Sequence, residues 1–99
     1  MTINIQYVRM DTSEAMNEYV TGKLEKLGKK YDWVISAQVH FEVIHDPKGK
    51  GKICKMELSL PGPRIFATSN EENYESAVKE TIKDLEKQLK KRKEQFSTH

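Results

Sequence analysis

A row of lysines in the last third of the sequence is the feature with the clearest chemistry. Residues 70–96 have the pattern of one long amphipathic helix, because apolar or small residues recur at the three- and four-residue spacing of a buried stripe. On such a helix Lys79, Lys83, Lys87 and Lys90 fall within an arc of about 80°, roughly opposite that stripe. We therefore expect the chemistry of this segment to be electrostatic and not catalytic.

Charge is also graded along this predicted helix. Six acidic residues and two lysines lie between Glu71 and Glu86, whereas five basic residues follow from Lys87 onward, against Glu94 alone. Helix-dipole complementarity explains the gradient, since carboxylates favour the N-terminus of a helix and ammonium groups its C-terminus. It explains less well the unbroken cationic run at residues 90–93, because the dipole effect fades within the last turn. A solvated helix end and an anion-binding surface both remain open on this helix alone.

The composition limits the classes of protein that the chain can represent. Ninety-nine residues form one domain, with enough buried surface for one core. Charged residues make up 32% of the chain but the net charge is only +2, so nucleic-acid binding must rest on segregation of charge. Cys54 is the single cysteine and forms no internal disulfide, and residues 1–6 are neither a signal peptide nor a membrane span. We expect a cytoplasmic protein with no membrane partner.

The order of the predicted elements is β-α-β-β-β-α. A first helix ends near Lys30, with Asp11 and Glu14 at capping-box spacing and Ser13 an equally good N-cap. Period-two alternation of apolar residues predicts strands over residues 3–7, 35–43, 54–60 and 65–69. Strands with one apolar face, together with two amphipathic helices, predict an α+β two-layer sandwich. In this fold a four-stranded sheet has both helices on one face, as in double-stranded-RNA-binding domains. The single domain spans residues 1–99, with about 3–93 ordered and a frayed tail over 94–99.

The first helix carries its own basic flank. Lys23, Lys26 and Lys30 fall within about 60° along one side of its buried stripe, and the acidic residues lie on its back. If the two helices lie side by side, this flank and the lysine row of the second helix merge into one cationic surface. The sequence leaves open which flanks adjoin.

The residues give little support to an enzyme or a metal site. His40 and His45 are five apart on one predicted strand and so point to opposite faces. His45 and Cys54 can lie diagonally across a hairpin, but two ligands without a third make a poor metal site. Glycines 49 and 51 have the surroundings of a turn. We expect no catalytic residue, no metal, no cofactor and no small-molecule substrate.

Several stretches, taken in order, resemble the family of ribosome hibernation factors, which includes the short hibernation-promoting factor and the ribosome-associated inhibitor also called protein Y. The similarity runs from about Asn4 to Lys93. It rests on Asn4-Ile5, residues 12–20, Lys23, Lys26 and Lys29 near the start, and on Ala77-Val78 and residues 85–91 near the end. Two departures stand out: Asn73-Tyr74-Glu75 replaces the family's usual Asp-Met-Tyr, and Asp84 occupies a position that is often lysine.

The resemblance implies a function. It implies binding to 16S-type rRNA of the small ribosomal subunit, in the channel of messenger and transfer RNA, so that idle ribosomes are inhibited and preserved. Because the chain lacks the C-terminal domain of the long factors and an acidic tail, it resembles the short form that promotes ribosome dimers. The residues expected to bind rRNA phosphates are Lys23, Lys26, Lys29, Lys30, Lys79, Lys83, Lys87, Lys90, Lys91, Arg92 and Lys93.

Two other function classes are consistent with the sequence. One is a protein-interaction module that modulates the alternative sigma factor through the open sheet face, where we expect Gln38, His40, Glu42 and Ile44 to lie. The other is a generic double-stranded-RNA binder, since two helices on a small sheet also describe that fold. Replacing Lys87, Lys90 and Lys91 by glutamate should abolish binding under both RNA hypotheses and leave a protein partner on the sheet face unaffected. Competition with transfer RNA separates the two RNA hypotheses.

Overall fold

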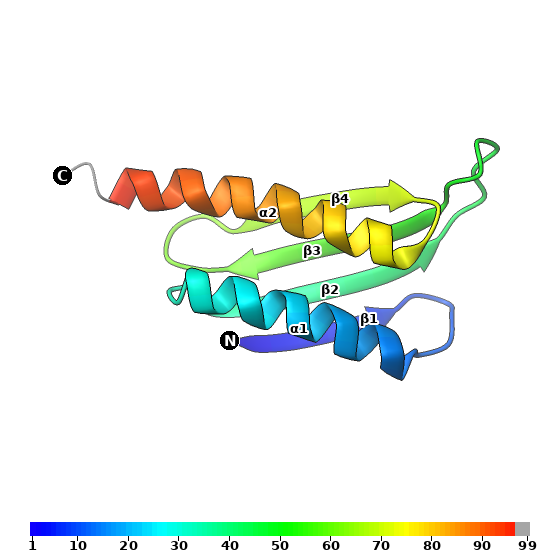
Figure 1. Ribbon diagram of the computed structural model, residues 1–99, viewed down its shortest axis with the longest axis horizontal. Coiled ribbons are helices and arrows are strands. Elements are labelled where there is room, and N and C mark those ends of the chain that lie inside the picture. Colours follow the sequence, from blue (N-terminus) through cyan, green and yellow to red (C-terminus); the bar gives the residue numbers. More distant parts are fainter. Residues whose placement is uncertain (97–99) are drawn as a thin grey trace.

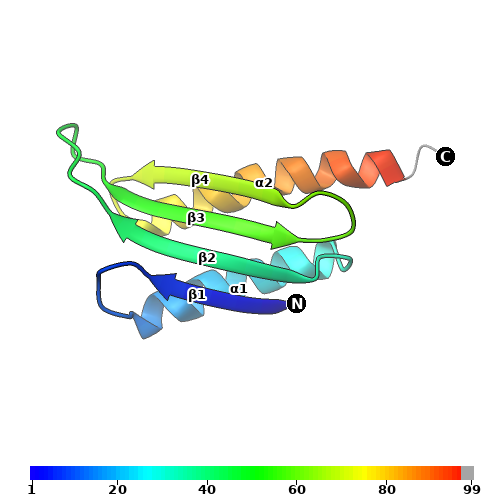
Figure 2. The ribbon, with the colours of Figure 1, turned by 180° about the vertical axis from the view of Figure 1, so that it is seen from behind.

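The computed structural model describes residues 1–96 and shows the predicted order of elements. Its strands and helices are β1 (Thr2–Tyr7), α1 (Glu14–Lys30), β2 (Ser36–Val43), β3 (Lys52–Ser59), β4 (Ile65–Glu71) and α2 (Tyr74–Phe96). The sheet order is β1-β2-β3-β4, with β1 parallel to β2 and the other pairs antiparallel. Both helices cover one face of the sheet and leave the other face open (Figures 1 and 2). The predicted two-layer α+β sandwich is confirmed.

The core lies between the helices and the covered face of the sheet. It forms where the helical stripes meet the alternating apolar residues of the three strands β2, β3 and β4. Its fully buried members from the helices are Val20, Leu24, Ala77, Val78, Thr81, Leu85 and Leu89, and from the strands Ala37, Val39, Phe41, Cys54 and Leu58. Thr81 is the polar member, and its hydroxyl donates to the Ala77 carbonyl at 2.7 Å, so the buried oxygen is satisfied.

A capping side chain marks the N-terminal end of each helix. Ser13 is the N-cap of α1, and its hydroxyl accepts a hydrogen bond from the Met16 amide at 3.2 Å. The prediction that the second helix begins at Asn70 is wrong, because Asn70 pairs with Ile53 as part of β4. The helix begins instead after Asn73, whose side-chain oxygen accepts from the Ser76 amide at 2.8 Å.

Three other expectations concern the ends of elements. The predicted strand over residues 35–43 begins one residue later, at Ser36, and the apolar residues at its two ends, Ile35 and Val43, are 60% and 50% exposed and lie outside the core. The helices bury the middle of the strand and not its ends. His45 lies beyond β2, so it does not share a strand with His40 as predicted. Residues 94–96 belong to α2, whereas the rest of the predicted tail, residues 97–99, lies outside the described residues.

Candidate nucleic-acid interface

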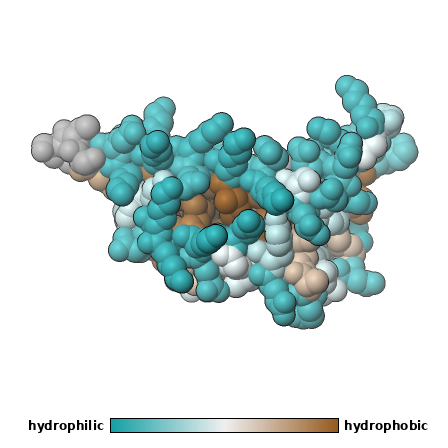
Figure 3. Space-filling model, viewed as in Figure 1, coloured by the Kyte–Doolittle hydropathy of each residue, from teal (hydrophilic) through white to brown (hydrophobic). Residues whose placement is uncertain are grey.

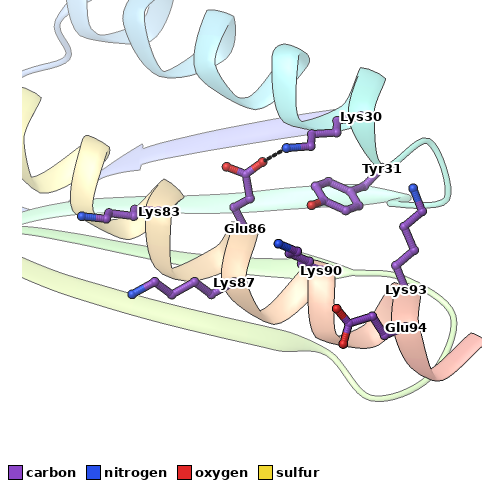
Figure 4. A pocket seen from close by; sticks show the side chains of 8 residues that line it. All are labelled: Lys30, Tyr31, Lys83, Glu86, Lys87, Lys90, Lys93 and Glu94. Atoms are coloured by element: carbon purple, nitrogen blue, oxygen red, sulfur yellow. Dashed lines mark hydrogen bonds and ion pairs between the residues drawn. The ribbon is translucent and has the colours of Figure 1, made fainter.

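A groove between the C-terminal halves of the two helices gathers five of the ten predicted lysines. Its volume is about 590 Å³. Figure 3 shows hydrophilic side chains around an apolar area on the helical face, and Figure 4 shows the side chains that line the groove from α1 and from α2. The residues that line the groove are Lys30, Tyr31, Lys83, Glu86, Lys87, Lys90, Lys93 and Glu94. Five lysines and two glutamates give this small surface a net charge of +3.

The spacing of the lysines explains how they reach one groove. Lys83, Lys87 and Lys90 are separated by four and three residues, so they project from one flank of α2. This flank faces α1, where Lys30 lies in the last turn. Lys26, one turn before Lys30, lines an adjoining hollow of about 310 Å³ together with Ile82 and Glu86. The structure therefore brings together the C-terminal parts of the two predicted basic flanks, without Lys23 and Lys79.

One lysine of the groove is already paired. The Lys30 ammonium donates to the Glu86 carboxylate at 2.7 Å, and the two side chains are 63% and 40% exposed. This hydrogen bond, together with the negative charge of Glu86, raises the pKa of Lys30 above its usual value. Lys83, Lys87 and Lys90 form no ion pair with any residue from 1 to 96. The groove thus presents these three ammonium groups to solvent.

The other predicted residues lie outside the groove. The Lys23 ammonium lies 5.6 Å from the centroid of the Tyr19 ring, and Lys29 lines a separate hollow beside Met1. Lys79 is exposed one turn before Lys83. Lys91 and Arg92 occupy the opposite flank of α2, where they line a hollow beside Ile65 on β4.

Arg92 has a structural role that the sequence did not indicate. Its guanidinium donates to the carbonyls of Pro61 and Pro63 at 3.0 and 2.9 Å. It therefore ties the β3–β4 turn to α2. The turn places Gly62 at φ +93°, a conformation that favours glycine.

Sequence reasoning missed three lining residues: Glu94, on the last turns of α2, and the more informative Tyr31 and Glu86. Glu86 counted only as part of the charge gradient, because its position relative to α1 is invisible in a single helical wheel. Tyr31 follows α1 directly and is 3% exposed, and it reaches the groove only because α1 packs beside α2. No periodic signal within one element marks either residue as part of a shared surface.

The remaining chemistry of the chain is limited. Within residues 1–96, no three histidine, cysteine, aspartate or glutamate side chains gather where they could hold a metal ion. Burial raises the pKa of the Cys54 thiol to about 11, so the thiolate is disfavoured. Over the same residues, neither helix has the length and apolar character needed to span a membrane.

The fold and the groove define a class of protein: a small α+β domain with a cationic surface shared by two helices. Residues 3–97 match the family model described as Sigma 54 modulation protein / S30EA ribosomal protein. The chain belongs to this family.

Similar proteins include named ribosome-associated factors. A ribosome hibernation promoting factor from Azotobacter vinelandii is 31% identical over 94 residues, which cover 95% of this chain and 84% of that protein. A ribosome-associated factor Y from Haemophilus influenzae is 31% identical over 91 residues, covering 92% and 81% of the two chains.

Solved structures share the fold. The chain superimposes on a ribosomal subunit interface protein from Coxiella burnetii with a TM-score of 0.83 and 28% identity, covering 94% of this chain and 98% of the other. The N-terminal domain of Protein Y from Thermus thermophilus gives a TM-score of 0.79 at 22% identity, covering 92% and 98%.

Proposed function

We propose that this protein is a cytoplasmic ribosome hibernation factor that binds rRNA of the small ribosomal subunit through the lysine groove. Docked in the decoding channel over the sites of messenger and transfer RNA, it would inhibit translation and preserve idle ribosomes, and promote ribosome dimers. The names of the relatives support a ribosomal role. The observation that carries the proposal is the convergence of lysines from α1 and α2 on one groove.

The geometry of the groove suits RNA phosphates. Ammonium groups held on two packed helices neutralise phosphates at fixed positions, so shape and phosphate spacing set where the protein docks. From Lys87 to Phe96, α2 carries five basic residues and one acidic residue, whereas from Tyr74 to Glu86 it carries four acidic residues and two lysines. A net charge of +2 for the whole chain therefore coexists with a local charge that favours RNA.

The test is co-sedimentation of the purified protein with small ribosomal subunits at several salt concentrations, with and without transfer RNA. We expect stoichiometric binding that weakens with salt and is displaced by transfer RNA. The double variant Lys87→Glu/Lys90→Glu removes two phosphate contacts, so the slope of log K against log salt should fall by about 1.4 to 1.8. At 100 mM salt that corresponds to a loss of about 25- to 60-fold in affinity, before any added repulsion.

A matched variant controls for bulk charge. Lys48→Glu/Lys50→Glu makes the same change in net charge on the β2–β3 hairpin, which extends from the end of the molecule opposite the C-terminal end of α2 (Figure 1). We expect it to bind subunits nearly as well as the unaltered protein. Equal losses in both double variants, or no binding at low salt, would rule out the groove as the interface.

A protein partner on the open sheet face is the second candidate. The observation that favours it is Phe66, which is 62% exposed on that face and lines a hollow with His40 and Glu57. Binding of such a partner would survive the groove variants. It would be lost in Phe66→Ser.

A further inference from the structure

Three aromatic rings extend from the floor of the lysine groove to the surface at its C-terminal end. Tyr31 lines the groove, and its ring centroid lies 5.9 Å from that of Trp33 at an interplanar angle of 80°. Trp33 in turn lies 5.1 Å from Phe96 at 76°. Tyr31 is buried, Trp33 is half-buried and Phe96 is 44% exposed, so the cluster opens outward. Solvent reaches the outer two rings, which meet face to edge as a corner.

Packing in the hydrophobic core explains the position of the Tyr31 ring but not that of the Phe96 ring. Tyr31 belongs to the buried core, whereas Phe96, on the last turn of α2, remains exposed while contacting the half-buried Trp33. It lies three residues after Lys93, which lines the groove, so an aromatic surface continues the row of lysines by one turn of helix. A ligand that follows the lysines would meet these rings next.

We propose that the corner formed by Trp33 and Phe96 is a stacking site for an unpaired nucleobase of an RNA strand whose phosphates lie along Lys83, Lys87 and Lys90. The inference rests on the proposed function and adds to it the class of RNA that the groove accepts. Single-stranded nucleic acids are bound by cationic grooves that track the backbone, together with aromatic rings on which bases stack. A base inside a duplex already stacks on its neighbours and cannot reach the rings. The ligand is therefore a single-stranded segment or an unpaired loop, and not a continuous duplex.

The protein carries its own reporter for this contact, since Trp33 is its single tryptophan. The experiment titrates the full chain with a single-stranded ten-nucleotide oligoadenylate, a ten-base-pair RNA duplex and inorganic polyphosphate of matched charge, and follows tryptophan fluorescence. We expect a base stacked at the corner to quench Trp33. Polyphosphate should bind with little quenching, because it supplies charge without a base.

Substitutions at Phe96 separate stacking from charge. Phe96→Leu retains apolar bulk at an exposed helix end but removes the ring, and should weaken oligoadenylate binding about 5-fold or more. Phe96→Tyr should restore the affinity, and polyphosphate binding should be the same for both variants. Phe66→Leu is the matched control, because it removes an exposed ring from the open sheet face, away from the groove.

The inference is overturned if Phe96→Leu and Phe66→Leu bind oligoadenylate equally well, or if the duplex and polyphosphate quench Trp33 as strongly as the single strand. It also fails if no free strand binds while subunits still co-sediment with the protein. In each of these cases the proposed ribosomal role stands, because subunit binding depends on the lysines. Loss of subunit binding by the unaltered protein would instead remove the proposed function.

Discussion

Replacing Glu86 by glutamine should tighten RNA binding, because Glu86 is a carboxylate inside a cationic groove. Its side chain holds the Lys30 ammonium at 2.7 Å, so one of the five groove lysines is engaged within the protein. Glutamine keeps the shape of the side chain and removes its charge. The net charge of the groove residues then rises from +3 to +4, and Lys30 becomes available to a phosphate.

The size of the effect follows from counterion release. One additional neutralised phosphate steepens the slope of log K against log salt by about 0.7 for a single strand and about 0.9 for a duplex. At 100 mM salt, this steeper slope corresponds to affinity about 5- to 8-fold tighter. The ion pair is exposed, at 63% and 40% for its two side chains, so solvent screens it and its loss should cost little folding stability. The variant should therefore remain folded.

The assay measures small-subunit binding of the unaltered protein and of Glu86→Gln at four or more salt concentrations. Glu57→Gln is the matched control, because it removes the carboxylate of the exposed Arg64–Glu57 ion pair and changes the net charge equally. Glu57 lies on the open sheet face, away from the groove. If the two variants show the same slope, the charge of the groove is not what binds RNA, and the reasoning is refuted.

Three further outcomes test the core, a structural arginine and the buried thiol. Leu85→Ala should lower the free energy of unfolding by about 2 to 5 kcal/mol in urea, because this side chain is fully buried between α2 and the sheet; a loss below about 1 kcal/mol would contradict that packing. Arg92→Met should lower it by about 1 kcal/mol, since two hydrogen bonds to the β3–β4 turn are lost. The same variant should change the salt slope of subunit binding less than Lys90→Met does, and an equal change would place Arg92 in the interface. Cys54 should not react with Ellman's reagent at pH 8 unless the protein unfolds. Because folding raises the thiol pKa from 9.0 to about 11, its contribution to stability is fully present below pH 9 and is lost as pH rises toward 11; Cys54→Ala should remove that part of the alkaline decline.

Much of the fold could be predicted because its signals are local. The apolar stripe of residues 70–96 and the alternation within residues 35–43 each follow from the period of one element. Of the two predicted N-caps of α1, Asp11 and Ser13, the structure uses Ser13, whose hydroxyl accepts from an amide three residues away. The start of α2 was misplaced because Asn70 has weak local preferences and is held in β4 by pairing with β3.

The candidate site was predictable only in part. The sequence by itself determined that Lys83, Lys87 and Lys90 share one flank of a helix, since helical spacing alone fixes that relation. The tertiary structure decided that this flank faces Lys30 and that Arg92 turns away to the β3–β4 turn. It also placed Glu86 against Lys30, across 56 positions of sequence. The physical reason is that a helical period fixes angles about one axis, whereas the meeting of two flanks depends on how both helices pack on the sheet.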